Sequence, residues 1–113
     1  MPEFFLSKSQ KRLARKVIEK GLLKDYERAN ERTASLIEKW RNGQVDHRKA
    51  YLDIYSHVIK YDEQIARRYD RITGSRYLFI IAAQLGDNCI TLQDLEEFNP
   101  KVIEKINILA GVD

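Results

Sequence analysis

A short segment that is apolar on every side constrains this chain more than any other feature of it. Residues 77–85 read Tyr-Leu-Phe-Ile-Ile-Ala-Ala-Gln-Leu, and they follow a charged helical pattern that stops at Thr73-Gly74-Ser75. A helix that is apolar all round must be surrounded by protein, because none of its sides favours contact with water. We therefore expect the rest of the chain to wrap this segment, either alone or with the help of a second copy.

The length and charge of the chain fit one domain built from solvated helices. Its 113 residues are enough for a modest core, so residues 1–113 are treated as a single domain. Charged residues make up 33% of the sequence, which suits long helices with exposed faces. The net charge of +3 is unevenly distributed, because residues 1–24 hold seven Lys or Arg against two Glu. The basic character is thus concentrated in the first predicted helix.

Three sequence features place the protein in the cytoplasm as an expectation. The single cysteine, Cys89, cannot form a disulfide within the chain, which argues against a secreted disulfide-rich scaffold. Phe4-Phe5-Leu6 precedes the basic run and no apolar stretch with a cleavage site follows, so the start does not resemble a signal peptide. The apolar segment at 77–85 is far shorter than the roughly 20 residues that span a bilayer.

Capping signals and apolar periodicity predict helices throughout, and no strand pattern is present. A basic helix is expected over about 8–41, starting near Ser7 or Ser9 and ending at Asn42-Gly43. Asp46 is a good N-cap for a second long helix over about 46–72. Shorter apolar helices follow over about 76–110. The predicted fold class is all-α, a long helical hairpin with a compact C-terminal helical head, and dimeric.

The apolar residues of the two long helices recur at helical spacing and predict where each helix packs. On the first helix the expected stripe is formed by Leu13, Val17, Leu22, Tyr26, Ala29, Thr33, Leu36, Ile37 and Trp40. On the second helix, one side is apolar with polar tips, which is typical of protein interfaces. We assign that side to a dimer interface formed by Tyr51, Ile54, Tyr55, Val58 and Ile59. Core packing inside one chain explains the same residues about equally well.

A basic row on the first helix admits three interpretations. Its members lie at helical spacing with only Glu19 opposing them: Lys8, Lys11, Arg12, Arg15, Lys16 and Lys20. The simplest interpretation is a solvated helix face. The others are contact with the phosphates of a nucleic acid and contact with an anionic membrane surface. We keep the nucleic-acid face as the alternative and expect no membrane partner.

The sequence offers no catalytic or metal-binding constellation, so an enzyme and a cofactor are not expected. His47 and His57 are ten residues apart and have no cysteine or carboxylate at zinc-ligand spacing. The adjacent carboxylates Asp62-Glu63 and Glu96-Glu97 point apart on a helix and cannot share one site. Phosphate-binding and nucleophile motifs are absent as well. Cys89 is interpreted as a small buried residue rather than a nucleophile.

The second half of the chain resembles a known family. Arg68-Tyr69-Asp70-Arg71, Phe79…Ala83-Gln84-Leu85, Leu92…Leu95 and Lys105-Ile106…Leu109 are similar to the C-terminal half of cyanobacterial fluorescence recovery proteins, over roughly residues 50–110. That family consists of small all-helical homodimers that bind the orange carotenoid protein and speed its return to the resting state. The resemblance implies the same fold, a homodimer and a protein partner. The partner-binding residues expected on this basis are Tyr55, Asp62, Arg67, Arg68 and Lys105.

The chain departs from the family at its functional patch. Where the family has a Trp, an adjacent His-Asp pair and an Arg, this sequence has Leu52, Tyr55-Ser56 and Asp62. The partner here can therefore differ from a carotenoid-binding protein. The sequence predicts a non-enzymatic, homodimeric, protein-binding regulator. The alternative is a nucleic-acid-binding accessory protein that uses the basic N-terminal helix.

Overall fold

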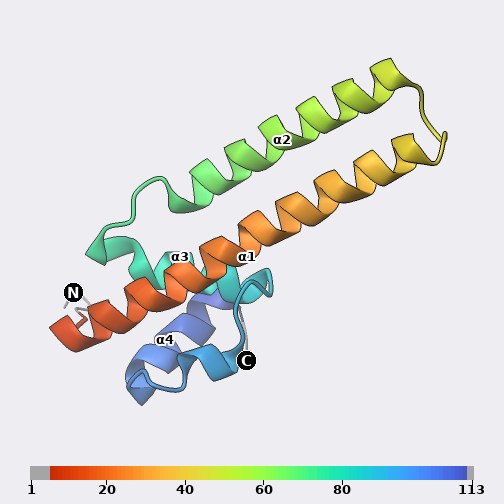
Figure 1. The fold of residues 1–113 in the computed structure, drawn as a ribbon. Helices are drawn as coiled ribbons and strands as arrows, with labels where there is room; N and C mark the ends of the chain where they lie inside the picture. Colours follow the sequence, from red (N-terminus) through yellow and green to blue (C-terminus); the bar gives the residue numbers. More distant parts are fainter. Residues whose placement is uncertain (1–5, 112–113) are drawn as a thin grey trace.

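The computed structural model describes residues 6–111 and forms a long two-helix arm joined to a small helical head (Figure 1). Helix α1 (Lys8–Arg41) and helix α2 (His47–Tyr69) run antiparallel and form the arm. The head contains α3 (Tyr77–Gly86) and α4 (Pro100–Ala110), with the short 3-10 helices η1 (Gly74–Arg76) and η2 (Leu92–Leu95). These described residues confirm the all-α class, and no strand occurs among them. Phe4-Phe5, used above against a signal peptide, lies outside the described range.

Helix α1 sets the length of the molecule. Its 34 residues, at about 1.5 Å of rise each, span most of the 57 Å long axis. Ser7 begins the helix as expected, because its hydroxyl accepts a hydrogen bond from the backbone N–H of Gln10 at 3.2 Å. The helix ends at Asn42, and Gly43 takes the left-handed conformation that the turn into α2 requires.

Local capping chemistry also defines the other helices. The Asp46 carboxylate accepts from the backbone N–H of Lys49 at 2.7 Å and begins α2. Thr91 and Asp94 form a capping box at η2, and Asn99 caps α4 with Pro100 at its first position. Gly111 closes α4 in the left-handed conformation. The expected second helix extends too far, since α2 ends at Tyr69 where the side chains of Arg68 and Tyr69 contact the α1 residue Asp25.

The core lies in the head and surrounds α3. Ile80 and Ile81 of α3 are almost completely buried, together with α1 and α4 residues and the segment between α3 and α4. The contributing side chains include Ala14, Val17, Ile18, Ile90, Leu95, Phe98, Val102 and Ile106. The predicted wrapping of the apolar segment is therefore correct for most of its residues. Phe79 is the exception, with 58% of its surface exposed, and Ala83 beside it is exposed as well.

The predicted apolar stripe of α1 is wrong in two places. Val17 and Leu36 are buried as expected, but Tyr26 and Trp40 are exposed. Within the head, the side of α1 that faces α3 is instead formed by Ala14, Ile18, Gly21 and Asp25, together with Val17. A polar residue and a glycine occupy positions that a hydrophobic pattern does not register, so the stripe was placed on a neighbouring side of the helix.

Candidate functional site

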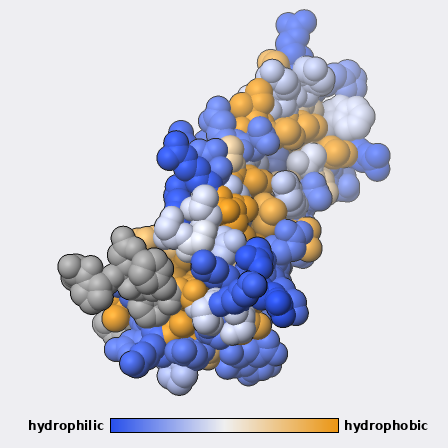
Figure 2. All heavy atoms as spheres, turned by 90° about the vertical axis from the view of Figure 1, so that its left-hand side faces the viewer, coloured by the Kyte–Doolittle hydropathy of each residue, from blue (hydrophilic) through white to orange (hydrophobic). Residues whose placement is uncertain are grey.

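An uncovered apolar surface follows the outer side of α2. Five residues make up this apolar α2 face, each between 41% and 69% exposed: Tyr51, Leu52, Tyr55, Val58 and Ile59. Their spacing of three and four residues places them on one side of the helix. Ala50 is the one fully buried residue of α2, although α2 lies against α1 along the arm. Figure 2 shows hydrophobic residues gathered on the surface of the arm.

The ends of the apolar α2 face carry opposite charges. Arg48, Tyr55 and Asp62 are separated by seven residues each, so they share one side of α2. Both Arg48 and Asp62 are exposed, and neither forms an ion pair with another described residue. Of the expected interface residues, Tyr51, Tyr55, Val58 and Ile59 lie on this face, while Ile54 is half-buried toward α1.

A polar network joins the C-terminal end of α2 to the head. One Arg68 guanidinium nitrogen lies 3.2 Å from both carboxylate oxygens of Asp25, and the other contacts Asp87. The Tyr69 hydroxyl donates to Asp25 at 2.5 Å and accepts from the Gln84 amide at 3.0 Å. The guanidinium of Arg68, expected to bind a partner, is thus already engaged within the chain.

Burial and charge in this network change the proton affinity of its members. Burial alone would lower the pKa of Arg68, but the hydrogen bond to Asp87 and the charge of Asp25 outweigh it and raise that pKa. Burial and the hydrogen bond to Asp25 raise the pKa of Tyr69. Burial also raises the pKa of the Cys89 thiol, whose sulfur lies 3.4 Å from Asp25. A buried thiol that resists ionisation fits the structural role expected for Cys89.

A hollow of about 320 Å³ separates the end of α2 from α3. Its lining combines Arg67, Arg68 and Arg76 with the apolar residues Phe79, Ile80 and Ala83. Arg67, one of the expected partner-binding residues, is exposed here. Lys105, the remaining member of that set, lies on α4, and α2 and α4 lie on opposite sides of α1 in Figure 1. Tyr55 and Asp62, the other two, lie on the apolar α2 face.

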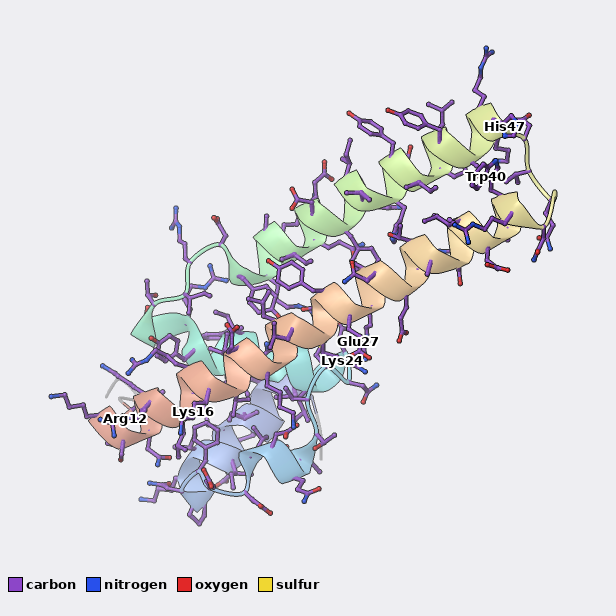
Figure 3. All side chains as sticks on the ribbon, in the orientation of Figure 1. Arg12, Lys16, Lys24, Glu27, Trp40 and His47 are labelled. Atoms are coloured by element: carbon purple, nitrogen blue, oxygen red, sulfur yellow. The ribbon has the colours of Figure 1, made fainter. Side chains whose placement is uncertain are left out.

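The basic row of α1 is partly used for contacts inside the chain. The Lys20 ammonium pairs with Asp94, and the Arg15 guanidinium lies 3.5 Å from the Tyr77 hydroxyl. Lys11 is half-buried beside Gly74, with its Cε atom 3.4 Å from a Cβ built there. Lys8, Arg12 and Lys16 remain exposed, and Figure 3 labels the last two on α1. The free part of the row is therefore about half as large as its sequence suggests.

The tip of the arm carries a contact that the sequence reasoning missed. The indole N–H of Trp40 donates to His47 Nδ1 at 2.8 Å, and the two rings meet edge to face (Figure 3). The apolar spacing predicts that Trp40 belongs to the stripe of α1, whereas its ring closes the turn between α1 and α2. The spacing of Trp40 and His47 across Asn42-Gly43 is the one sequence signal that pointed to this pairing.

Neither a metal centre nor a membrane span emerges from residues 6–111. No group of three or more His, Cys, Asp or Glu side chains there could hold a metal ion. None of the helices in that range is long and apolar enough to cross a bilayer.

Comparisons with protein-family models, curated proteins and solved structures found no match to this chain. The resemblance to fluorescence recovery proteins thus remains a prediction.

Proposed function

We propose that this chain is a homodimeric, non-enzymatic protein-binding module that regulates another protein. The observation that carries the proposal is the apolar α2 face, whose five large side chains are 41–69% exposed next to one another. Contiguous exposed apolar surface of this kind marks interaction sites in soluble proteins. Tyr51 and Tyr55 add hydroxyl groups that can stay hydrated at the rim, which is why tyrosine is enriched at interfaces.

The charges at the two ends of the face favour a second copy of the chain as its occupant. In an antiparallel pairing of two α2 helices centred on Tyr55, Arg48 of each copy would lie opposite Asp62 of the other. A parallel pairing would place like charges together. A surface that complements itself in this way is what a two-fold symmetric dimer requires. An unrelated partner would need no such symmetry.

The resemblance described above supports a protein as the regulated partner. It makes the orange carotenoid protein the first candidate, and the substitutions at Leu52, Tyr55, Ser56 and Asp62 make other proteins candidates too. Mixing the two purified proteins on a size-exclusion column tests this candidate directly. A shift in elution of the carotenoid protein would support it, and unchanged elution would eliminate it.

Light scattering at micromolar concentration tests the dimer. We expect about twice the 13.3 kDa mass of one chain for the wild type. Tyr55→Asp places a charge at the centre of the apolar α2 face and should give a monomer that keeps its helical circular dichroism. Ile108→Asp is the matched control, because Ile108 is 64% exposed against 57% for Tyr55 but lies on α4 in the head. A monomeric wild type, or a Tyr55→Asp variant that remains dimeric, would contradict the assignment.

A further inference from the structure

A second hollow lies further along the arm and is basic. It has a volume of about 470 Å³ between α1 and α2. Arg32 and Lys39 line it from α1, and His57 and Lys60 line it from α2. Its single carboxylate, Asp53, already pairs with Lys49 at 3.2 Å. The hollow therefore has a clear excess of positive charge.

The two hollows open on the same side of α2. Lys60 lines the 470 Å³ hollow between α1 and α2, called the upper hollow below. Arg67 lines the 320 Å³ hollow between the end of α2 and α3, called the lower hollow. The two residues are seven positions apart. Seven residues make almost two full helical turns and about 10 Å of rise, so both side chains leave the helix on one side. We call the surface formed by Arg32, Lys39, Lys60, Arg67 and Arg76 the basic flank.

The basic flank is separate from the apolar α2 face. At about 100° per residue, Lys60 points roughly 140° away from Tyr55 around α2. A second copy seated on the apolar α2 face would thus leave the basic flank open. Each dimer would present two such flanks, one from each chain.

The five cations of the basic flank outnumber the carboxylates near them, which are Asp53 in the upper hollow and the exposed Glu63, three residues after Lys60 on α2. None of the five forms an ion pair with another residue in the range 6–111. The exposed aromatic ring of Phe79 lies at the lower end of the flank, in a hollow shared with Ile80 and Ala83. The surface thus offers guanidinium and ammonium groups along its length and an apolar patch at one end.

We infer that the basic flank binds an acidic protein segment that carries an apolar side chain. Carboxylates suit arginine side chains because the planar guanidinium can hold them with two hydrogen bonds. Arg68, in the same lower hollow, is already held by the carboxylates of Asp25 and Asp87. A small anion would leave Phe79 uncovered, whereas a polypeptide covers both features. An extended segment of about three residues bridges the roughly 10 Å between the hollows.

The inference rests on the proposed protein-binding function and names the chemistry of the partner. The test uses a fluorescein-labelled peptide rich in Asp and Glu with a single Leu, titrated with the full chain and followed by fluorescence anisotropy. The salt concentration is about 0.15 M, where the Debye length is about 8 Å. Arg67→Gln combined with Arg76→Gln should weaken binding about tenfold or more, because each change removes a guanidinium that would hold a peptide carboxylate with two hydrogen bonds. Phe79→Ser should weaken it about fivefold through lost apolar contact.

The matched control is Lys8→Gln combined with Arg12→Gln, which removes the same charge from the basic row of α1. We expect it to change peptide affinity by less than about twofold, because exposed charges beyond contact distance are screened by salt. Equal weakening by the control would overturn the inference, since binding would then follow net charge alone. Unchanged binding by Phe79→Ser would also overturn it.

Two further measurements separate peptide binding by the basic flank from dimer formation and from nucleic-acid binding. Light scattering on the same variants should still give the dimer mass, so loss of peptide binding with an intact dimer concerns the flank alone. A labelled single-stranded DNA that binds the wild type more tightly than the peptide, and loses affinity equally in the flank variants, would assign the surface to nucleic acid instead.

Discussion

Replacing Gly21 with alanine should destabilise this protein, although the same substitution in the middle of a helix normally increases stability. Gly21 is buried on the side of α1 that faces α3. A Cβ atom built at this position would lie 2.2 Å from Gln84 Nε2 and 2.5 Å from Gln84 Cδ. Gln84 has no exposed surface, and its amide donates to the Ile18 carbonyl at 2.9 Å and to the Tyr69 hydroxyl at 3.0 Å. The amide therefore has no free space to enter and would lose both partners on moving.

Opposing contributions decide the sign of the effect. Alanine is favoured over glycine inside a helix by about 1 kcal/mol. A displaced Gln84 loses two hydrogen bonds of about 1 kcal/mol each. Inserting a methyl group into a packed core costs about 1–3 kcal/mol more. The free energy of unfolding should therefore fall by about 2–4 kcal/mol on Gly21→Ala.

A double-mutant cycle measured by denaturant unfolding at fixed protein concentration checks this reasoning. Gln84→Ala removes the side chain that the new methyl group would meet, so Gly21→Ala in that background should stabilise by about 1 kcal/mol. The same substitution thus changes sign with its neighbour. If Gly21→Ala stabilised the wild-type protein, the close packing of Gln84 on α1 would be refuted.

Three other predictions follow from named contacts. Ile81→Asp should abolish folding, seen as loss of helical circular dichroism, because burying an unpaired carboxylate costs several kcal/mol and Ile81 has no exposed surface; a wild-type melting curve would contradict the core assignment. Burial alone would raise the pKa of Asp94, but the hydrogen bonds from Lys20 and Thr91 outweigh it and lower that pKa. Its carboxylate thus adds stability above the unfolded pKa of about 4, and that stability is lost as the pH falls through the lower folded value. Asp94→Asn should then lower stability by about 1 kcal/mol at neutral pH, with the difference in melting temperature vanishing in acid. Changing Lys8, Arg12 and Lys16 to Gln should leave the melting temperature nearly unchanged, since exposed charges contribute little; if wild-type protein also fails to bind DNA at about 50 mM salt, the nucleic-acid alternative should be abandoned.

The sequence by itself determined the features that depend on neighbouring residues. The helix ends are defined by the backbone and side-chain chemistry of single capping residues, namely Ser7, Asp46, Asn99 and Gly111. Their roles can therefore be predicted from the local sequence. The sequence of α3 is apolar on every side, and this pattern predicts a surrounding core. These signals were sufficient for the all-α class and for the arm and head.

Only the tertiary structure decided which sides of these helices meet. Gln84 lies far in sequence from Gly21 and Asp25, and none of the three carries an apolar signal, yet they form the contact between α1, α2 and α3. The same is true of Phe79, which is exposed inside an apolar segment and lines a hollow together with Arg67 and Arg68 of α2. Periodicity reports that a side of a helix is apolar, but the burial of that side depends on partners that come from elsewhere in the chain. For that reason the apolar residues of α2 were found from sequence, while their exposure, and the basic flank beside them, required the fold.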